Sequence, residues 1–165
     1  MTLAEMFVHG IVVTERARGE GIVAAAAKIM AWQGAGDPRP AILVELPIVT
    51  KSPNKGTFSR AGAMARHAEN AAHRDLARAQ TLRMMGLAKL TARDLVPAVV
   101  TLTRISAGHL DGHDNLRAAL KRVVDGVCRA LGVDDGDEER VEFRYEQRKG
   151  PRMKSGVHVL IERRP

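Results

Sequence analysis

The sequence predicts an α+β fold, in which a mixed or antiparallel sheet of about four strands carries two main helices packed on one face. Three observations support this class. Four short segments are rich in β-branched residues, and two longer segments have the periodicity of helices. The length of 165 residues suits one domain with a small extra segment, and 45% apolar with 27% charged residues is ordinary globular usage.

The first 40 residues differ from the rest and are predicted to form an N-terminal appendage to a main domain of residues 41–165. Phe7–Val13 is a candidate short strand, and Gly21–Trp32, which contains a run of alanines, is a candidate helix. The Gly/Pro-rich segment 34–40 then breaks the chain before the main domain begins.

The main domain opens with a strand, a basic loop and a long helix. Ile42–Ile48 is apolar and rich in β-branched residues, and the polar segment Thr50–Thr57 follows it as a loop. A helix is expected from Ser59 to about Met85. Its narrow apolar stripe is predicted to consist of Ala65, Ala68, Ala72, Leu76, Ala79 and Leu82.

A second strand and a second helix come next. Val96–Ile105 is predicted to be a strand, with its proline near the start where a missing N–H is tolerated. Asp114 or Asn115 caps a helix that runs to about Leu131 and ends at Gly132.

The chain ends with two further strand candidates. Val141–Gln147 alternates apolar and charged residues, and Val157–Ile161 is again apolar. The basic segment 148–156 separates them. Residues 141–162 are therefore predicted to form a β-hairpin with a long loop.

Composition excludes several classes of site. Cys128 is the only cysteine, which excludes a cysteine-based zinc site and an intramolecular disulfide. No run approaches the roughly 18 apolar residues of a membrane span, and the N-terminus lacks a basic-then-apolar signal, so a cytosolic protein is expected. Recognition by base stacking is disfavoured because only five residues are aromatic: Phe7, Trp32, Phe58, Phe143 and Tyr145.

The formal net charge of +7 is distributed unevenly. Residues 106–139 hold eight acidic residues against four basic ones, while the rest of the chain holds 22 basic against 11 acidic residues. A basic body around an acidic segment suits a polyanion partner together with a cation site. The simpler interpretation is a basic surface with one acidic loop.

The helix expected over residues 114–131 has two distinct sides on a helical wheel. One arc is apolar and predicted to face the core: Leu116, Leu120, Val123, Val127 and Leu131. The opposite side carries Asp114, Arg117, Ala118, Lys121, Asp125 and Cys128. This side therefore presents acidic and basic groups at spacings of roughly one and two turns.

Acidic residues flank this helix at both ends and suggest a metal site. Asp111 precedes the helix, and Asp134 and Asp135 follow it. The two ends are about 25 Å apart along a straight helix, so these groups meet only if the chain folds back or a second subunit supplies one of them. Asp111, Asp114 and an incoming Asp135 would then hold Mg²⁺, which prefers oxygen ligands and promotes phosphodiester hydrolysis. Lys121 would stabilise charge on the phosphoryl oxygens.

Each of these residues also has a simpler interpretation. Asp114 is a good N-cap, and Lys121 with Asp125 forms an i,i+4 pair. Residues 134–139 suit a solvated acidic turn, and Cys128 suits a packed core position. His109 and His113 are candidates for a metal ligand or an acid–base group, but surface histidines are commoner.

At this segment the sequence resembles the RusA family of Holliday junction resolvases and their phage-type relatives. The family pattern is an Asp-x-Asp-Asn-Leu run that opens a helix, a downstream lysine, and an Asp-Asp pair after that helix. The matching residues are Asp114-Asn115-Leu116, Lys121 followed by Asp125, and Asp134-Asp135. The resemblance spans residues 41–163 and is most specific over 110–135. Gly112 stands at the place of the family's first aspartate, so Asp111 would have to replace it, and Ala118 stands where the lysine is commonest.

The resemblance implies a magnesium-dependent, structure-specific endodeoxyribonuclease that resolves four-way DNA junctions by paired symmetric nicks, with manganese as a substitute metal. Such proteins are homodimers, bacterial or phage-encoded. By position, Asp114 and Asp135 are the expected metal ligands, with Asp111 and Asp134 assisting, and Lys121 is the expected catalytic lysine. The residues expected to bind DNA phosphates are Lys51, Lys55, Arg117, Arg148, Lys149, Arg152 and Lys154.

Two rival functions remain open at this point. One is a non-catalytic DNA-binding protein of the same fold, which the displaced first aspartate favours. The other is an interaction module whose acidic segment recruits a basic partner.

Overall fold

The computed structural model describes residues 39–50, 60–110, 114–150 and 155–165. The expected strand Phe7–Val13 and helix Gly21–Trp32 lie outside these residues. The same holds for five expected site residues, Lys51, Lys55, Asp111, Arg152 and Lys154, and for His113 and the side chain of Asp114.

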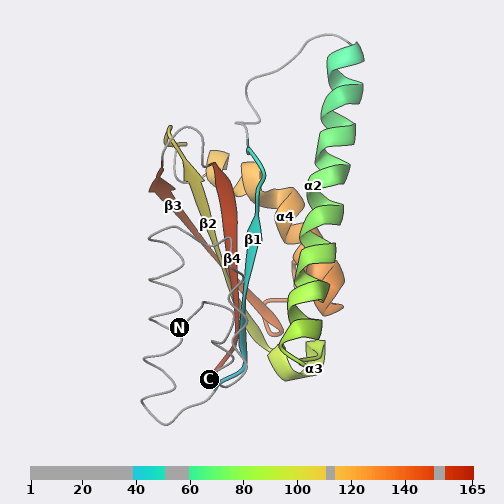
Figure 1. The fold of residues 1–165 in the computed structure, drawn as a ribbon, viewed down its shortest axis with the longest axis vertical. Coiled ribbons are helices and arrows are strands. Elements are labelled where there is room, and N and C mark those ends of the chain that lie inside the picture. The colour runs from blue at the N-terminus through green and yellow to red at the C-terminus, as the bar shows by residue number, and fades with distance from the viewer. Residues whose placement is uncertain (1–38, 51–59, 111–113, 151–154) are drawn as a thin grey trace, which may run out of the picture.

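The described part is an α+β fold with one mixed sheet, as expected (Figure 1). Its strands are β1 (Ala41–Leu46), β2 (Ala98–Ser106), β3 (Val141–Lys149) and β4 (Gly156–Arg163), in the order β1-β4-β2-β3. β4 pairs antiparallel with both β1 and β2, while β3 pairs parallel with β2. The helices are α2 (Arg60–Leu87), the short α3 (Ala92–Leu95) and α4 (Asp114–Leu131), and the two long ones lie on the same side of the sheet. Within the described residues, no helix has the length and apolar character needed to span a membrane.

The predicted hairpin of residues 141–162 is wrong. β4 is inserted between β1 and β2, and β3 lies beside β2 at the outer edge of the sheet. The physical reason is the connection through α4. Parallel strands need a crossover of a dozen or more residues, and the 18-residue helix α4 provides one between β2 and β3.

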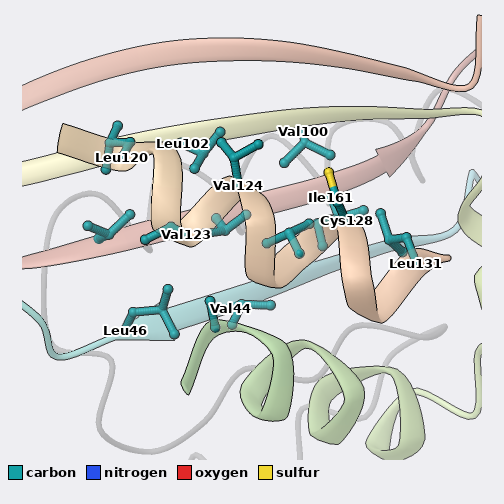
Figure 2. Close-up of a cluster of buried hydrophobic side chains, with 14 of the residues drawn as sticks. Val44, Leu46, Val100, Leu102, Leu120, Val123, Val124, Cys128, Leu131 and Ile161 are labelled. Atoms are coloured by element: carbon teal, nitrogen blue, oxygen red, sulfur yellow. The ribbon is translucent and has the colours of Figure 1, made fainter. Parts of the chain in front are cut away.

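The predicted apolar face of α4 is confirmed. Its five residues are at most 3% exposed and belong to the hydrophobic core: Leu116, Leu120, Val123, Val127 and Leu131. Figure 2 shows Leu120, Val123 and Leu131 among the buried side chains between α4 and the sheet. They pack against the inward side chains of three strands, among them Val44, Val100 and Ile161, which are fully buried. This layer holds α4 rigidly on the sheet and therefore fixes where its opposite, polar side points.

The predicted apolar stripe of α2 is wrong. Ala65, Ala68, Ala72, Ala79 and Leu82 are all exposed, and only Leu76 is partly buried. The buried positions are Ala77, Thr81, Met84 and Met85, in the second half of the helix. The first turns of α2 extend past the end of the sheet (Figure 1), so no described element covers them there.

The two long helices contact each other closely at one glycine. A Cβ atom added to Gly126 of α4 would lie 2.3 Å from the backbone oxygen of Arg74 and 2.7 Å from the Cβ of Ala77, both on α2. Only glycine fits where the two backbones approach this closely. Gly126 therefore sets the distance between α2 and α4.

Candidate functional site on the polar side of α4

The polar side of α4 carries an ammonium group between two carboxylates. Gly132 ends the helix in a left-handed conformation with φ 65°, and the N–H of Val133 donates to the carbonyl of Cys128. The chain then turns back, and Asp135 reaches the middle of α4. There Lys121 Nζ donates to Asp135 Oδ2 and lies 2.9 Å from Asp125 Oδ1.

These contacts settle the charge state of each group. The hydrogen bond from Lys121 lowers the pKa of Asp135, so this carboxylate is ionised at neutral pH. The bonds to Asp135 and Asp125 raise the pKa of Lys121, so the ammonium stays protonated. Lys121 can therefore donate to an anion but cannot act as a base.

The acidic residues that surround Asp135 have local roles. Asp134 Oδ1 accepts from the N–H of Gly136 at 2.9 Å, and Asp137 Oδ1 accepts from the N–H of Arg140 at 3.2 Å. Both are the side chain-to-backbone bonds typical of turns. The acidic segment is thus a hydrogen-bonded turn, and Asp135 is the member of it that points to α4.

A pocket of about 630 Å³ lies beside this ion pair, between the polar side of α4 and the edge strand β3. Its lining is mixed, with charged and apolar side chains: Arg117, Asp135, Glu138, Val141, Glu142, Phe143, Tyr145 and Arg164. The guanidinium carbon of Arg117 lies 5.3 Å from the centre of the Tyr145 ring, within the range of a cation–π contact. Burial raises the pKa of the Tyr145 phenol, so the ring stays neutral beneath the guanidinium.

Two sheet side chains hold the loop that leads into α4. Arg104 is 6% exposed, and its guanidinium donates to Thr50 Oγ1 at 2.9 Å and to the carbonyl of Gly108 at 2.7 Å. Gln147 donates to the carbonyl of Leu110 at 2.6 Å and accepts from its N–H at 3.0 Å. Arg104 and Gln147 together therefore hold residues 108–110 in place.

The expected site residues fall into three groups. The structure brings Lys121 and Asp135 together, although they are 14 residues apart, and places Arg117 in the same pocket. Asp114 is the first residue of α4, about 10 Å along the helix axis from Lys121. Arg148 and Lys149 are exposed at the end of β3, away from this pair.

Two further side chains follow the simpler interpretation. His109 is exposed on its loop. Cys128 is 5% exposed, so its expected place on the polar side of the helix is wrong and its expected packing is confirmed. Burial raises its pKa to about 12, so it is an inert thiol.

Sequence reasoning missed Tyr145, Arg104 and Gln147 as parts of this region. A signal existed for Arg104, which has the same strand parity as the buried Val100 and Leu102, so an alternating strand places it on the core side. Tyr145 gains its position from the parallel pairing of β3 with β2, which was not predicted.

Comparison of the chain with protein-family models and with curated proteins gives no match to either. The assignment of a function therefore depends on the residues and their geometry.

Proposed function

We propose that the protein is a magnesium-dependent endodeoxyribonuclease that nicks branched DNA, four-way junctions above all, and acts as a homodimer. The observation that carries the proposal is the meeting of Lys121 and Asp135 beside a pocket that Arg117 lines. A protonated ammonium next to an ionised carboxylate suits a site that handles a phosphodiester. The net charge of +7 suits the DNA polyanion. That the substrate is a four-way DNA junction is inferred from the resemblance to the RusA family.

Each charged residue of the site has its own proposed role. Asp135 is ionised, and its Oδ1 is not the atom that Lys121 contacts. Lys121 is placed to neutralise negative charge on the phosphoryl oxygens. Arg117, held over the Tyr145 ring, is placed to bind a neighbouring phosphate.

The donor chemistry of Asp135 fits one ligand of Mg²⁺, which commonly uses one or two carboxylates and completes its shell with water and substrate oxygens. Asp114, with Asp111 and Asp134 assisting, is the expected second ligand, but it lies about 10 Å along α4 from Lys121, so a second subunit would have to bring Asp114 to Asp135. When bound, the ion activates water and stabilises the leaving oxygen. Within the described side chains, no three His, Cys, Asp or Glu residues come together as a metal-binding group. The proposal therefore requires a contribution from residues 111–114.

The test is strand cleavage of a synthetic four-way junction in Mg²⁺ or Mn²⁺. Lys121→Met should lower the cleavage rate by about 100-fold, because a positioned cation no longer faces the developing charge. Asp114→Asn should abolish cleavage and leave junction binding intact. Lys89→Met removes an equal charge from an exposed position that neither lines the pocket nor contacts Asp135, and it should cleave as wild type does. Normal cleavage by both Lys121→Met and Asp114→Asn would refute the site.

A non-catalytic DNA-binding protein is the second candidate, and one observation favours it. Lys121 already neutralises Asp135, as expected of an ion pair that only stabilises the turn. This candidate predicts salt-dependent junction binding by the wild type with no cleavage in any divalent metal. An interaction module for a basic partner predicts no DNA binding even at low salt.

A further inference from the structure

β3 is the outermost strand of the sheet, and no other strand in the described residues pairs with its outer edge. Such an edge presents free backbone N–H and C=O groups to any strand of suitable shape. We propose that two copies of the chain join β3 to β3 in antiparallel order about a two-fold axis at Tyr145, so that the two sheets become one.

The face of β3 turned away from the helices carries charges of alternating sign. Tyr145 pairs with the buried Leu102 and therefore lies on the helix side of β3. The residues next to it and at every second position of the strand point to the other side. These are Glu142, Arg144, Glu146 and Arg148. In an antiparallel pair, side chains directly opposite each other interact, favourably when their charges are opposite.

The midpoint of the strand and the pattern of charges select the same register. β3 runs from Val141 to Lys149, so full overlap of two copies is centred on Tyr145. Glu142 then faces Arg148 of the second copy, and Arg144 faces Glu146 of the second copy. Every acid is opposite a base.

Other registers lose charge complementarity or overlap. Centring the pair on Arg144 puts this arginine opposite itself and sets Glu142 against Glu146. Centring it on Phe143 restores opposite charges but leaves an overlap of about five of the nine strand residues. The register with the longest ladder is thus also the one without like-charge contacts.

The charged side chains of β3 already have partners within the chain, which they would share or exchange. Glu146 Oε2 accepts a hydrogen bond from Thr103 Oγ1 at 3.2 Å. Arg144 and Glu142 already pair within the strand at 2.8 Å, and their side chains are 55% and 44% exposed. Surface ion pairs of this kind are weak and exchange readily. Charged side chains on an edge strand disfavour pairing with most other strands, whereas this register sets every acid of β3 opposite a base of the second copy.

The proposed interface adjoins the candidate site. Tyr145 would lie opposite itself across the axis, and Arg117 rests on its ring in each copy. The two pockets would lie on the same side of the joined sheet, next to each other. That this arrangement offers two sites to two strands of a junction rests on the proposed function; the interface itself does not.

The first test is the mass of the full chain in solution by size-exclusion chromatography with light scattering. The wild type should have twice the chain mass of 17.9 kDa. Glu146→Arg sets arginine against Arg144 at two symmetric places and should weaken the dimer by about tenfold or more. The double variant Arg144→Glu with Glu146→Arg restores every acid–base pair and should restore the dimer. Asp75→Arg, an equal charge reversal on exposed α2, should have no effect.

A second test fixes the register. Position 145 is the one place where a residue meets its own copy, so Tyr145→Cys should form a disulfide-linked dimer on mild oxidation, whereas Phe143→Cys should not. A monomeric wild type, a dimer that Glu146→Arg leaves unchanged, or a double variant that stays dissociated would each overturn the interface. Junction cleavage is scored separately, so a dimer without cleavage refutes only the proposed function, and cleavage without this dimer refutes only the interface.

Discussion

The two long helices of this protein differ in how their sequences specify the face they bury. α4 carries large aliphatic residues on one side, and these are buried as the helical wheel predicts. α2 carries a stripe of alanines that stays exposed, while methionines near its C-terminal end and Ala77 are buried. Burial free energy scales with apolar area, so a Leu/Val face decides the orientation of a helix and an alanine stripe does not.

The sharpest test of this difference is truncation of the α4 core. Leu120 is fully buried, so Leu120→Ala removes contacts and leaves a cavity. We expect a loss of about 3 kcal/mol in the free energy of unfolding. Urea unfolding followed by circular dichroism measures it. A loss below about 1 kcal/mol would mean that α4 is not packed as described.

The contact between the helices is tested at glycines. Gly126→Ala places a methyl group against the α2 backbone and should cost about 2 kcal/mol of unfolding free energy. Gly86→Ala in α2 is the matched control, because a Cβ there meets nothing within 4 Å. It should stabilise the protein by about 0.5–1 kcal/mol through helix propensity. Equal effects at both positions would contradict the close approach at Gly126.

The ion pair on the polar side of α4 should contribute far less to stability than the core. Both side chains are more than 40% exposed, so Asp135→Asn should cost less than about 1 kcal/mol. The lowered pKa of Asp135 gives stability that is present above the unfolded carboxyl pKa of about 3.9 and is lost as pH falls through the lower folded value. The wild type and the variant should therefore converge in stability in strong acid. A difference that persists there would point to a cause other than this charge.

The smallest change in the free energy of unfolding is expected at Leu82, the leucine at the end of the exposed stripe of α2. Leu82 is 43% exposed, so Leu82→Ala should change the free energy of unfolding by less than about 0.5 kcal/mol. Thermal melts of the variant beside Leu120→Ala make the contrast direct. A loss as large as that at Leu120 would show that the stripe is buried in solution, for instance against another chain.

The fold class could be predicted from the sequence, but the strand order could not. Each strand has a local pattern, whereas the pairing of β3 with β2 depends on how α4 carries the chain across the sheet, which no window of residues records. Edge position also follows from pairing. The charged alternation of β3 was visible, but its place at an edge was not.

The local contacts of the candidate site could be predicted from the sequence, but the contacts between distant segments could not. The helical spacing places Lys121 beside Asp125, and both contacts of Lys121 are with acids singled out in the sequence. The turn after Gly132 that returns Asp135 to α4 could only be named as one way for the groups to meet. Arg117 over Tyr145 is a contact between distant segments and depends on tertiary packing.

The most direct measurement is the rate at which the wild type and Asp135→Asn cleave a four-way junction in Mg²⁺, compared at equal fractions of bound DNA. Glu139→Gln, an equal charge change in the same exposed turn, is the control. We expect cleavage by the wild type and the control, and binding without cleavage by Asp135→Asn. Equal cleavage by all three proteins, or none by the wild type in any divalent metal, would contradict a nuclease site built on Asp135 and Lys121.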